Sequence, residues 1–300
     1  MSKNTDLSGL YSVIEESSRL VDVPCARDTV WPILTAFEDT LAQAVIAFRV
    51  ATGERNAGDF DCRFTMLPKG LDPYAVALAN GLTAPTDHPV GSLLEELCRE
   101  FPVESGGIDF GVVGGFKKTW SFFPTDSLQS LSELVRLESM PASAAENLDF
   151  FTRYDLADRV SLVGIDYPHK SLNLYFGAAP AATFEPEGIT AILRDAGLPA
   201  PSERLLGFGA RAFGIYATLS WESAKVERIT IAAMTPDPTA LPVRIEEKIE
   251  HYVNKAPYST EDRQFVYAIT SAPTGEYHKL QSYYKWHSQV ENTLLVTGNG

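Results

Sequence analysis

The segment RVSLVGIDYPHKSLNLYF, residues 159–176, decides the expected fold, because its second half alternates strictly between the two faces of a strand. Turn-forming residues stand at its centre, in Tyr167-Pro168-His169, so the segment is typical of a β-hairpin. The strand after the turn places Lys170, Leu172, Leu174 and Phe176 on one face, and His169, Ser171, Asn173 and Tyr175 on the other. Since helices must cover the apolar face, we expect the polar face to point into an enclosed interior.

Four further segments have the same hairpin pattern, and the turn centres lie about 50 to 60 residues apart, as in repeat architectures. They span Gln43–Met66, Asp109–Phe123, Arg211–Met234 and Arg263–Trp286. Helical periodicity fills the gaps, with two helices before each of the first three strand pairs and one clear helix before each of the last two. The expected helices are Leu7–Leu20, Asp28–Ala44, Leu71–Gly81, Pro89–Phe101, Ser127–Arg136, Ala142–Tyr154, Pro186–Ala196 and Pro242–Asn254.

This repeated order of helices and strand pairs predicts an α/β (α+β) fold with one central barrel. Ten antiparallel strands with helices on one side close most simply into a barrel surrounded by helices, since closure removes exposed sheet edges. No linker rich in Pro, Ser or charge interrupts the series. We therefore expect residues 1–300 to form a single domain, with residues 296–300 as a disordered tail.

Composition and charge restrict the partners of this chain. Its 25 Lys and Arg against 39 Asp and Glu give a net charge of −14, which disfavours nucleic acid and anionic membrane surfaces. The cysteines Cys25, Cys62 and Cys98 form no CxxC pair, the N-terminus has no signal-peptide pattern, and no apolar run has membrane-spanning length. We expect a cytoplasmic monomer with reduced thiols.

The barrel lumen is the expected site of chemistry, because ten strands enclose more space than the eight that side chains just fill. Period-2 parity directs five cations into that lumen, with His169 as a further donor: Arg49, Arg63, Lys118, Arg228 and Lys279. Buried like charges are costly unless an anion neutralises them, so the pattern indicates a phosphate or diphosphate site. The alternative is that each cation reaches solvent or pairs with Asp59, Asp61 or Asp166.

Aromatic side chains share the lumen face with these cations, namely Trp120, Tyr175, Tyr216 and Tyr283. An aromatic stripe alone is more often core packing. Beside an anion site, it suggests a carbocation shielded by π faces while Lys and Arg hold its leaving group.

Motifs of several other enzyme classes are missing from the sequence. DDxxD, GxSxG, the P-loop and HExxH are absent, and the stretch that begins at Gly207 has Ala212 where a dinucleotide fingerprint needs its third glycine. Serine hydrolases, nucleotide-dependent kinases and zinc enzymes are therefore disfavoured.

Over nearly its whole length the sequence resembles the soluble aromatic prenyltransferases of the NphB and CloQ type, which have the ABBA or PT-barrel fold. The segments that carry the resemblance are GGFKKTWSFFPTD at 114–126, Asp166-Tyr167 with NLYF at 173–176, Tyr216 with Trp221-Glu222, KAPY at 255–258, and EYHKL at 276–280 with Tyr283-Tyr284. The resemblance implies transfer of an allylic prenyl group from its diphosphate to an electron-rich aromatic carbon.

The resemblance also implies roles for individual residues. The diphosphate ligands of the family match Lys118, Tyr216, Arg228 and Lys279. Asn173 is expected on the same wall, and His169 stands where the family has a lysine. The aromatic side chains expected to shield the cation are Trp120, Tyr175 and Tyr283. Residues expected to contact the acceptor are Phe122, Ser161, Phe213, Gly214, Ala232, Gln281 and Gln289. No residue is singled out as the base.

Two departures from the NphB pattern refine these expectations. Asp61 matches the aspartate that holds magnesium and is the metal ligand if Mg²⁺ is used, but Arg49 and Arg63 replace the serines that flank it. Since a guanidinium supplies positive charge in place of a metal, we expect no required cofactor and turnover in EDTA. Trp120 replaces a tyrosine, and its larger ring predicts a shorter tunnel that favours a five-carbon donor.

The expected function is therefore transfer of a dimethylallyl group from dimethylallyl diphosphate to a phenol, naphthol or dihydrophenazine in secondary metabolism. Three alternatives remain at this point: a Mg²⁺-dependent geranyl transferase, a non-catalytic barrel that carries an aromatic small molecule, and a metal-dependent phosphatase using Asp59 and Asp61.

Overall fold

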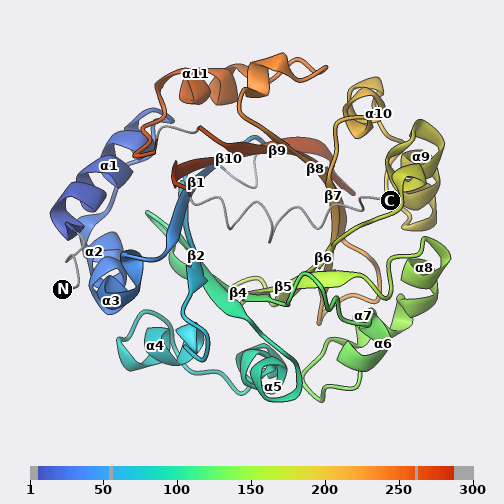
Figure 1. The fold of residues 1–300 in the computed structure, drawn as a ribbon, viewed down its shortest axis with the longest axis horizontal. Coiled ribbons are helices and arrows are strands. Elements are labelled where there is room, and N and C mark those ends of the chain that lie inside the picture. Colours follow the sequence, from blue (N-terminus) through green and yellow to red (C-terminus); the bar gives the residue numbers. More distant parts are fainter. Residues whose placement is uncertain (1–5, 54–56, 261–262, 287–300) are drawn as a thin grey trace.

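The computed structural model describes residues 6–53, 57–260 and 263–286. Within these ranges ten strands form a closed barrel in the order β1-β10-β9-β8-β7-β6-β5-β4-β3-β2, and every neighbouring pair is antiparallel (Figure 1). The strands are β1 (Val45–Ala51), β2 (Asp61–Leu67), β3 (Ser105–Gly111), β4 (Gly115–Phe122), β5 (Val160–Asp166), β6 (Ser171–Phe176), β7 (Gly214–Ser220), β8 (Arg228–Thr235), β9 (Phe265–Ala272) and β10 (Gly275–Lys285). The predicted barrel is confirmed.

Helices surround the barrel on its outside (Figure 1). They are α1 (Leu7–Arg19), α2 (Arg27–Ala36), α3 (Glu38–Leu41), α4 (Pro73–Ala79), α5 (Leu93–Glu100), α6 (Leu131–Leu134), α7 (Ala142–Glu146), α8 (Leu148–Arg153), α9 (Pro186–Asp195), α10 (Glu203–Gly209) and α11 (Glu247–Lys255). Short 3₁₀ turns are η2 (Pro89–Gly91), η3 (Ala181–Phe184) and η4 (Pro238–Ala240). No helix in the described ranges has the length and apolar character needed to cross a membrane.

Some helix boundaries differ from the sequence prediction. The segment Asp28–Ala44 is divided at Phe37, whose φ of −110° and ψ of 9° lie outside helical values. Helix prediction over Ser127–Arg136 is mostly wrong, because Gln129 pairs with Val160 in an isolated β-bridge and only α6 is helical. Similarly, Ala142–Tyr154 is interrupted at Asn147, and the helix expected over Pro242–Asn254 begins only at α11.

The prediction of a single helix before the fourth strand pair missed α10. Its N-terminus has the expected sequence signature, since the Ser202 side chain accepts a hydrogen bond from the Leu205 amide and Glu203 follows.

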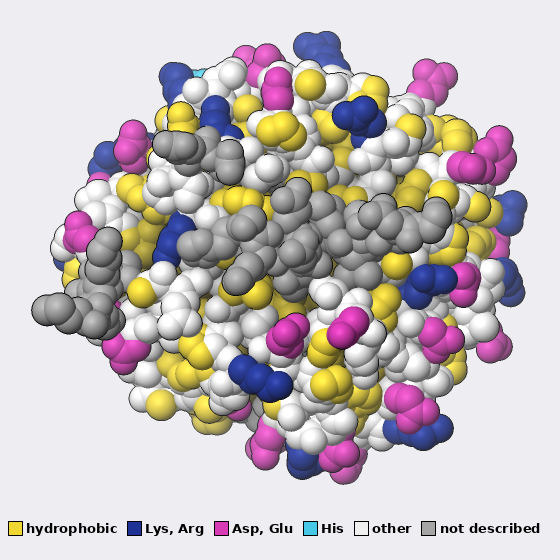
Figure 2. Space-filling model, viewed as in Figure 1, with side chains coloured by type: hydrophobic (Ala, Val, Ile, Leu, Met, Phe, Trp, Pro, Cys, Tyr) yellow, Lys and Arg dark blue, Asp and Glu magenta, His cyan; other side chains and the backbone are white. Residues whose placement is uncertain are grey.

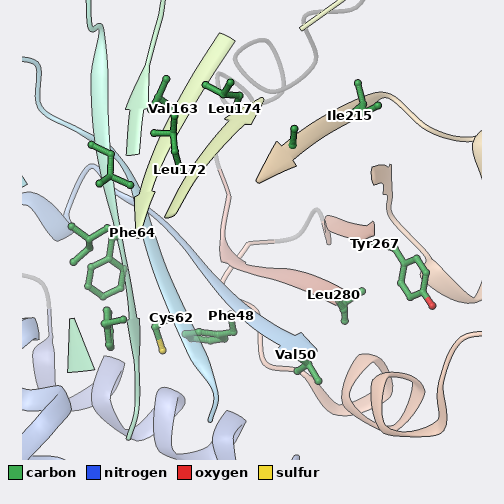
Figure 3. Close-up of a cluster of buried hydrophobic side chains, with 14 of the residues drawn as sticks. Phe48, Val50, Cys62, Phe64, Val163, Leu172, Leu174, Ile215, Tyr267 and Leu280 are labelled. Atoms are coloured by element: carbon green, nitrogen blue, oxygen red, sulfur yellow. The ribbon is translucent and has the colours of Figure 1, made fainter. Parts of the chain in front are cut away.

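The main hydrophobic core lies between the barrel and the helices. Strand side chains such as Phe48, Phe64, Leu172, Leu174 and Leu280 face outward and are buried in it (Figure 3). The apolar face predicted for the third hairpin therefore packs against helices, and the opposite parity lines the lumen.

β-bulges interrupt the regular alternation in four strand pairs. In the β3–β4 pair, Asp109 is opposite Lys118 while Phe110 is opposite Phe116, so Lys117 is the extra residue. A bulge re-aims a side chain that strict alternation would place on the other face. Lys117 therefore lies on the same side of the strand as Lys118 instead of facing the helices. Its charge contributes to the ion pairs described below.

Charged side chains of both signs lie around the edge of the face in Figure 2, which looks along the same direction as Figure 1. No large cluster of one sign gathers in the part of this face that is described.

The outward packing of β6 predicts the effect of truncating Leu174, which is fully buried. Leu174→Ala should lower the free energy of unfolding by about 2–5 kcal/mol, because it leaves a cavity between barrel and helices. Urea denaturation measures this. Val113→Ala, at a position 47% exposed, serves as the control and should change it by less than about 0.5 kcal/mol. A small effect of Leu174→Ala would contradict the parity described here.

Candidate active site

The barrel interior contains a cavity of about 120 Å³. Fifteen residues predicted from the sequence line it: Arg49, Arg63, Lys118, Trp120, Phe122, Ser161, Asn173, Tyr175, Phe213, Gly214, Tyr216, Ala232, Lys279, Gln281 and Tyr283. They come from strands all around the barrel, which explains why residues so distant in sequence meet.

Two predicted residues, Arg228 and His169, do not line the cavity, and a third lies outside the described residues. Arg228 is buried, pairs in register with Thr218 and lies close to Lys279, but it is set back from the cavity lining. His169 lies at the β5–β6 turn, where about half of its side chain is exposed. Gln289 lies outside the described residues.

The third hairpin connects His169 to the cavity through a carboxylate. The Nδ1 atom of His169 lies 3.0 Å from Oδ1 of Asp166, and the other oxygen of Asp166 lies 2.7 Å from Nζ of Lys118. Burial opposes ionisation of Asp166, but Lys118 and His169 together hold the pKa of Asp166 well below its usual range. His169 thus acts on the cavity through Asp166 and Lys118, without lining it.

A second carboxylate, Asp109 on β3, lies at the centre of the arginine cluster. Arg63 donates from Nε at 2.6 Å and from Nη2 at 2.9 Å to its two oxygens, a bidentate pair. Arg49 approaches the same carboxylate at 3.9 Å. Asp109 is 1% exposed, and despite that burial the neighbouring arginines lower its pKa.

Arg49 continues this network toward Asp61. Its Nε donates to Oδ2 of Asp61 at 2.9 Å, and its Nη2 contacts the same oxygen. Lys117 lies on the other side, 2.7 Å from Oδ1 of Asp61, and also contacts Asp59. Burial would lower the pKa of Lys117, but the two carboxylates outweigh it and raise that pKa.

These contacts correct the expectation that the converging cations are balanced only by a ligand. Arg49 pairs with Asp61 and Lys118 with Asp166, as the alternative interpretation proposed, and Arg63 pairs with Asp109. Sequence analysis missed both Asp109 and Lys117. Period-2 alternation with Ile108 and Phe110 would have directed Asp109 inward, whereas no periodic pattern reveals the bulge at Lys117.

Lys279 differs from the other lysines that line the cavity. It has no carboxylate partner among the described residues, and its Nζ lies 5.7 Å from the ring centre of Tyr216 and 5.1 Å from that of Tyr277. Burial lowers the pKa of Lys279 well below its usual value, and the charges of Arg49, Arg228 and Lys118 lower it further. An anion bound beside it would reverse this shift.

Asn173 offers a second unused donor beside the cavity. Its Oδ1 accepts a hydrogen bond from Thr218 at 2.8 Å, while its buried Nδ2 has no partner among the described residues. Buried donors in folded proteins are normally paired, so an unpaired one that lines a cavity indicates a position for a ligand acceptor atom.

Aromatic rings form the wall next to these donors. Tyr175 and Tyr216 stack with ring centres 4.3 Å apart, and Trp120 meets Tyr175 edge-on at 5.3 Å. Burial raises the pKa of Tyr216 to about 12, so its phenol stays neutral near pH 7 and can donate a hydrogen bond. Tyr283 lines the opposite part of the cavity and packs against Trp286.

Comparison with known proteins agrees with this geometry. A family model described as "Aromatic prenyltransferase Orf2" matches residues 5–293. The chain is 60% identical over 296 residues to "5,10-dihydrophenazine-1-carboxylate 9-dimethylallyltransferase" of Streptomyces anulatus, with 99% of both chains covered. It is 49% identical over 298 residues to "Flaviolin linalyltransferase" of Streptomyces virginiae, again with 99% of both covered. A "Furaquinocin biosynthesis prenyltransferase" of Streptomyces sp. (strain KO-3988) is 50% identical over 283 residues, which is 94% of this chain and 92% of that protein.

The environment of Lys279 predicts proton uptake when an anion binds. Burial and the neighbouring cations lower the pKa of Lys279, and a bound diphosphate should raise that pKa again, so we expect a proton to enter from the buffer as the anion binds. Calorimetric titration with inorganic diphosphate in two buffers of different ionisation enthalpy measures the uptake. Lys279→Met should reduce the proton uptake by up to about one proton. It should also weaken diphosphate binding about tenfold or more, because a charged hydrogen bond is lost.

Lys69→Met, which removes an exposed lysine outside this cavity, is the matched control and should match the wild type. Equal proton counts and equal affinities in Lys279→Met and wild type would contradict the prediction.

Proposed function

The chain belongs to the aromatic prenyltransferase Orf2 family and is therefore an enzyme that transfers prenyl groups; we propose that its donor is dimethylallyl diphosphate and its acceptor a ring carbon of a dihydrophenazine. The observation that carries this proposal is the position of Lys279, a cation without a carboxylate partner among the described residues, directly beside the tyrosine wall. One cavity thus offers an anion site and a π surface in contact with each other.

Donor binding uses the cation-lined part of the cavity. Lys118 and Lys279 approach the diphosphate from opposite sides of the lumen, with Tyr216 and Asn173 on the wall between them and Arg228 close to Lys279. Arg49 and Arg63, already oriented by Asp61 and Asp109, add positive charge. As the bond between the allylic carbon and the diphosphate oxygen breaks, its electron pair stays on that oxygen, and these groups stabilise the growing negative charge.

The allylic cation left behind faces the aromatic wall. Tyr175, Tyr216 and Tyr283 exclude water from it and stabilise it by cation–π contact, about 1–2 kcal/mol per ring when desolvated. The acceptor ring then donates an electron pair to form the new C–C bond, and the arenium ion loses its proton to water or to the diphosphate. We assign no side chain as the base.

The dihydrophenazine acceptor is proposed from the 60%-identical relative, whose printed name includes that substrate class. Small residues leave room for a multi-ring molecule on one side of the cavity, where Gly214, Ala232 and Ala268 follow one another across β7, β8 and β9. Ser161, Phe213 and Gln281 lie on the lining as further candidate contacts.

We further propose that turnover needs no metal ion. Magnesium takes oxygen ligands in near-octahedral geometry, whereas both oxygens of Asp61 already accept hydrogen bonds from Arg49 and Lys117. Among the described residues no three His, Cys, Asp or Glu side chains are grouped as a metal site. The present donor set therefore does not fit Mg²⁺, and the two cations beside Asp61 supply positive charge there instead.

The alternatives receive less support. The family is one of transferases, which counts against a carrier and a phosphatase, and Lys117 engages both Asp59 and Asp61, the carboxylates a phosphatase would need. A ten-carbon donor stays the closest rival, since one relative is named a linalyltransferase. We further propose a cytoplasmic protein without a nucleic-acid or membrane partner, on the basis of the acidic net charge of the sequence and its lack of a CxxC pair.

The test is mass spectrometry of products from dimethylallyl or geranyl diphosphate with a panel of dihydrophenazines, naphthols and phenols, in EDTA and in Mg²⁺. We expect a singly dimethylallylated dihydrophenazine in both buffers. Lys279→Met should abolish most of the product, and the surface control Lys69→Met should retain it.

Product only with Mg²⁺ would overturn the metal-independent mechanism, and faster turnover of geranyl diphosphate would overturn the donor assignment. Prenylation only of phenols or naphthols would overturn the acceptor assignment. Phosphate release without any acceptor would instead support the phosphatase alternative.

A further inference from the structure

The indole ring of Trp120, on β4, packs between two glycines on the neighbouring strands β3 and β5. In the sheet register Gly107 of β3 and Gly164 of β5 are its direct cross-strand partners. A Cβ atom added at Gly164 would lie 2.4 Å from Cζ3 and 2.7 Å from Cε3 of the indole. A Cβ at Gly107 would lie 3.2 Å from Cδ1 and 2.9 Å from the carbonyl oxygen of Phe64. The ring therefore occupies space that any other residue at these two positions would fill.

The polar edge of the indole is fixed as well. Its Nε1 donates to Oδ1 of Asp109 at 2.9 Å, and the guanidinium of Arg63, held by the same carboxylate, lies 4.1 Å from the ring centre. Trp120 is 1% exposed. The two glycines and Asp109 thus form a slot that holds the indole against the wall of the cavity.

The slot lies beside the hydrocarbon part of the cavity. Trp120 forms a small apolar cluster with Phe122 and Leu162, and Tyr175 packs against it. Lys279, which carries the proposed anion site, lies against Tyr216 and Tyr277, whereas Arg63 contacts the indole itself. A shift of the indole out of the slot therefore removes space from the apolar side of the cavity.

We propose that Gly164, together with Gly107, positions Trp120 and thereby sets the length of the prenyl chain that the cavity accepts. This inference rests on the proposed function only in taking a prenyl diphosphate as donor. Both glycines are positioning residues, since they act on the donor through the indole.

Alanine at position 164 tests the mechanism directly. Carbon atoms in contact lie about 3.5–4.0 Å apart, so a methyl group 2.4 Å from Cζ3 forces the indole to move by about 1 Å. Since Trp120 lines the cavity, the open space into which the indole can move lies in the lumen. A ten-carbon chain extends further along the apolar wall than a five-carbon chain. It therefore loses more contact with that wall when the indole moves.

The experiment measures the dissociation constants of inorganic diphosphate, dimethylallyl diphosphate and geranyl diphosphate by calorimetry. For Gly164→Ala we expect at least tenfold weaker binding of geranyl diphosphate, less than threefold weaker binding of dimethylallyl diphosphate, and inorganic diphosphate within twofold of wild type. Adding Trp120→Phe to Gly164→Ala should restore geranyl diphosphate binding, because the smaller ring no longer meets the new methyl group.

The matched control is Gly207→Ala on helix α10, where an added Cβ meets no atom within 4 Å. It should leave all three affinities unchanged, and thermal unfolding of every variant checks the fold. If Gly164→Ala does not fold, Trp120→Phe alone carries the test, and it should increase the affinity for geranyl relative to dimethylallyl diphosphate.

Equal weakening of all three ligands in Gly164→Ala, or no rescue by Trp120→Phe, would overturn this inference while leaving the proposed function in place. An unchanged ratio of geranyl to dimethylallyl diphosphate affinity in Trp120→Phe would also overturn this inference and leave the proposed function in place. Failure of the wild type to bind either prenyl diphosphate would overturn the proposed function and this inference with it.

Discussion

Neutralisation of buried charge is the constraint on which the interior of this barrel depends. Arg63, Asp109, Arg49, Asp61 and Lys117 follow one another with alternating sign, so each ion has a neighbour of opposite charge. Breaking one such pair leaves an uncompensated charge in a low-dielectric interior, which costs several kcal/mol. The network therefore orients the cations before any ligand binds, and ligand binding requires little reorganisation of these side chains.

Much of this architecture follows from alternation in the sequence. The third hairpin separates Leu172 and Leu174 from Asn173 and Tyr175, and the structure places the first pair under helices and the second on the cavity. The same parity brought most of the candidate site residues to the lumen. Alternation works here because helices cover one face of every strand and leave the other to the interior.

The remainder depends on features without a periodic signal. The bulge that turns Lys117 inward is a local change of register, and the partners of Arg63 and Lys118 depend on which strands become neighbours. His169 illustrates the limit, since its parity pointed into the lumen while its position at the turn joins it to Asp166 instead. Short helices such as α6 and α10 fall below the length at which periodicity is informative.

Closure of the barrel has a consequence for how the protein is made. Strand β1, residues 45–51, pairs with β10, residues 275–285, so the seam joins segments separated by most of the chain. Contacts of such sequence separation form slowly, because the entropy of closing a long loop is lost before they are gained. Lys279 and Tyr283 belong to β10, which follows the other nine described strands in the sequence. The cavity is therefore complete only after β10 has been synthesised and has paired with β1, and a shorter nascent chain lacks the lysine on which the anion site depends.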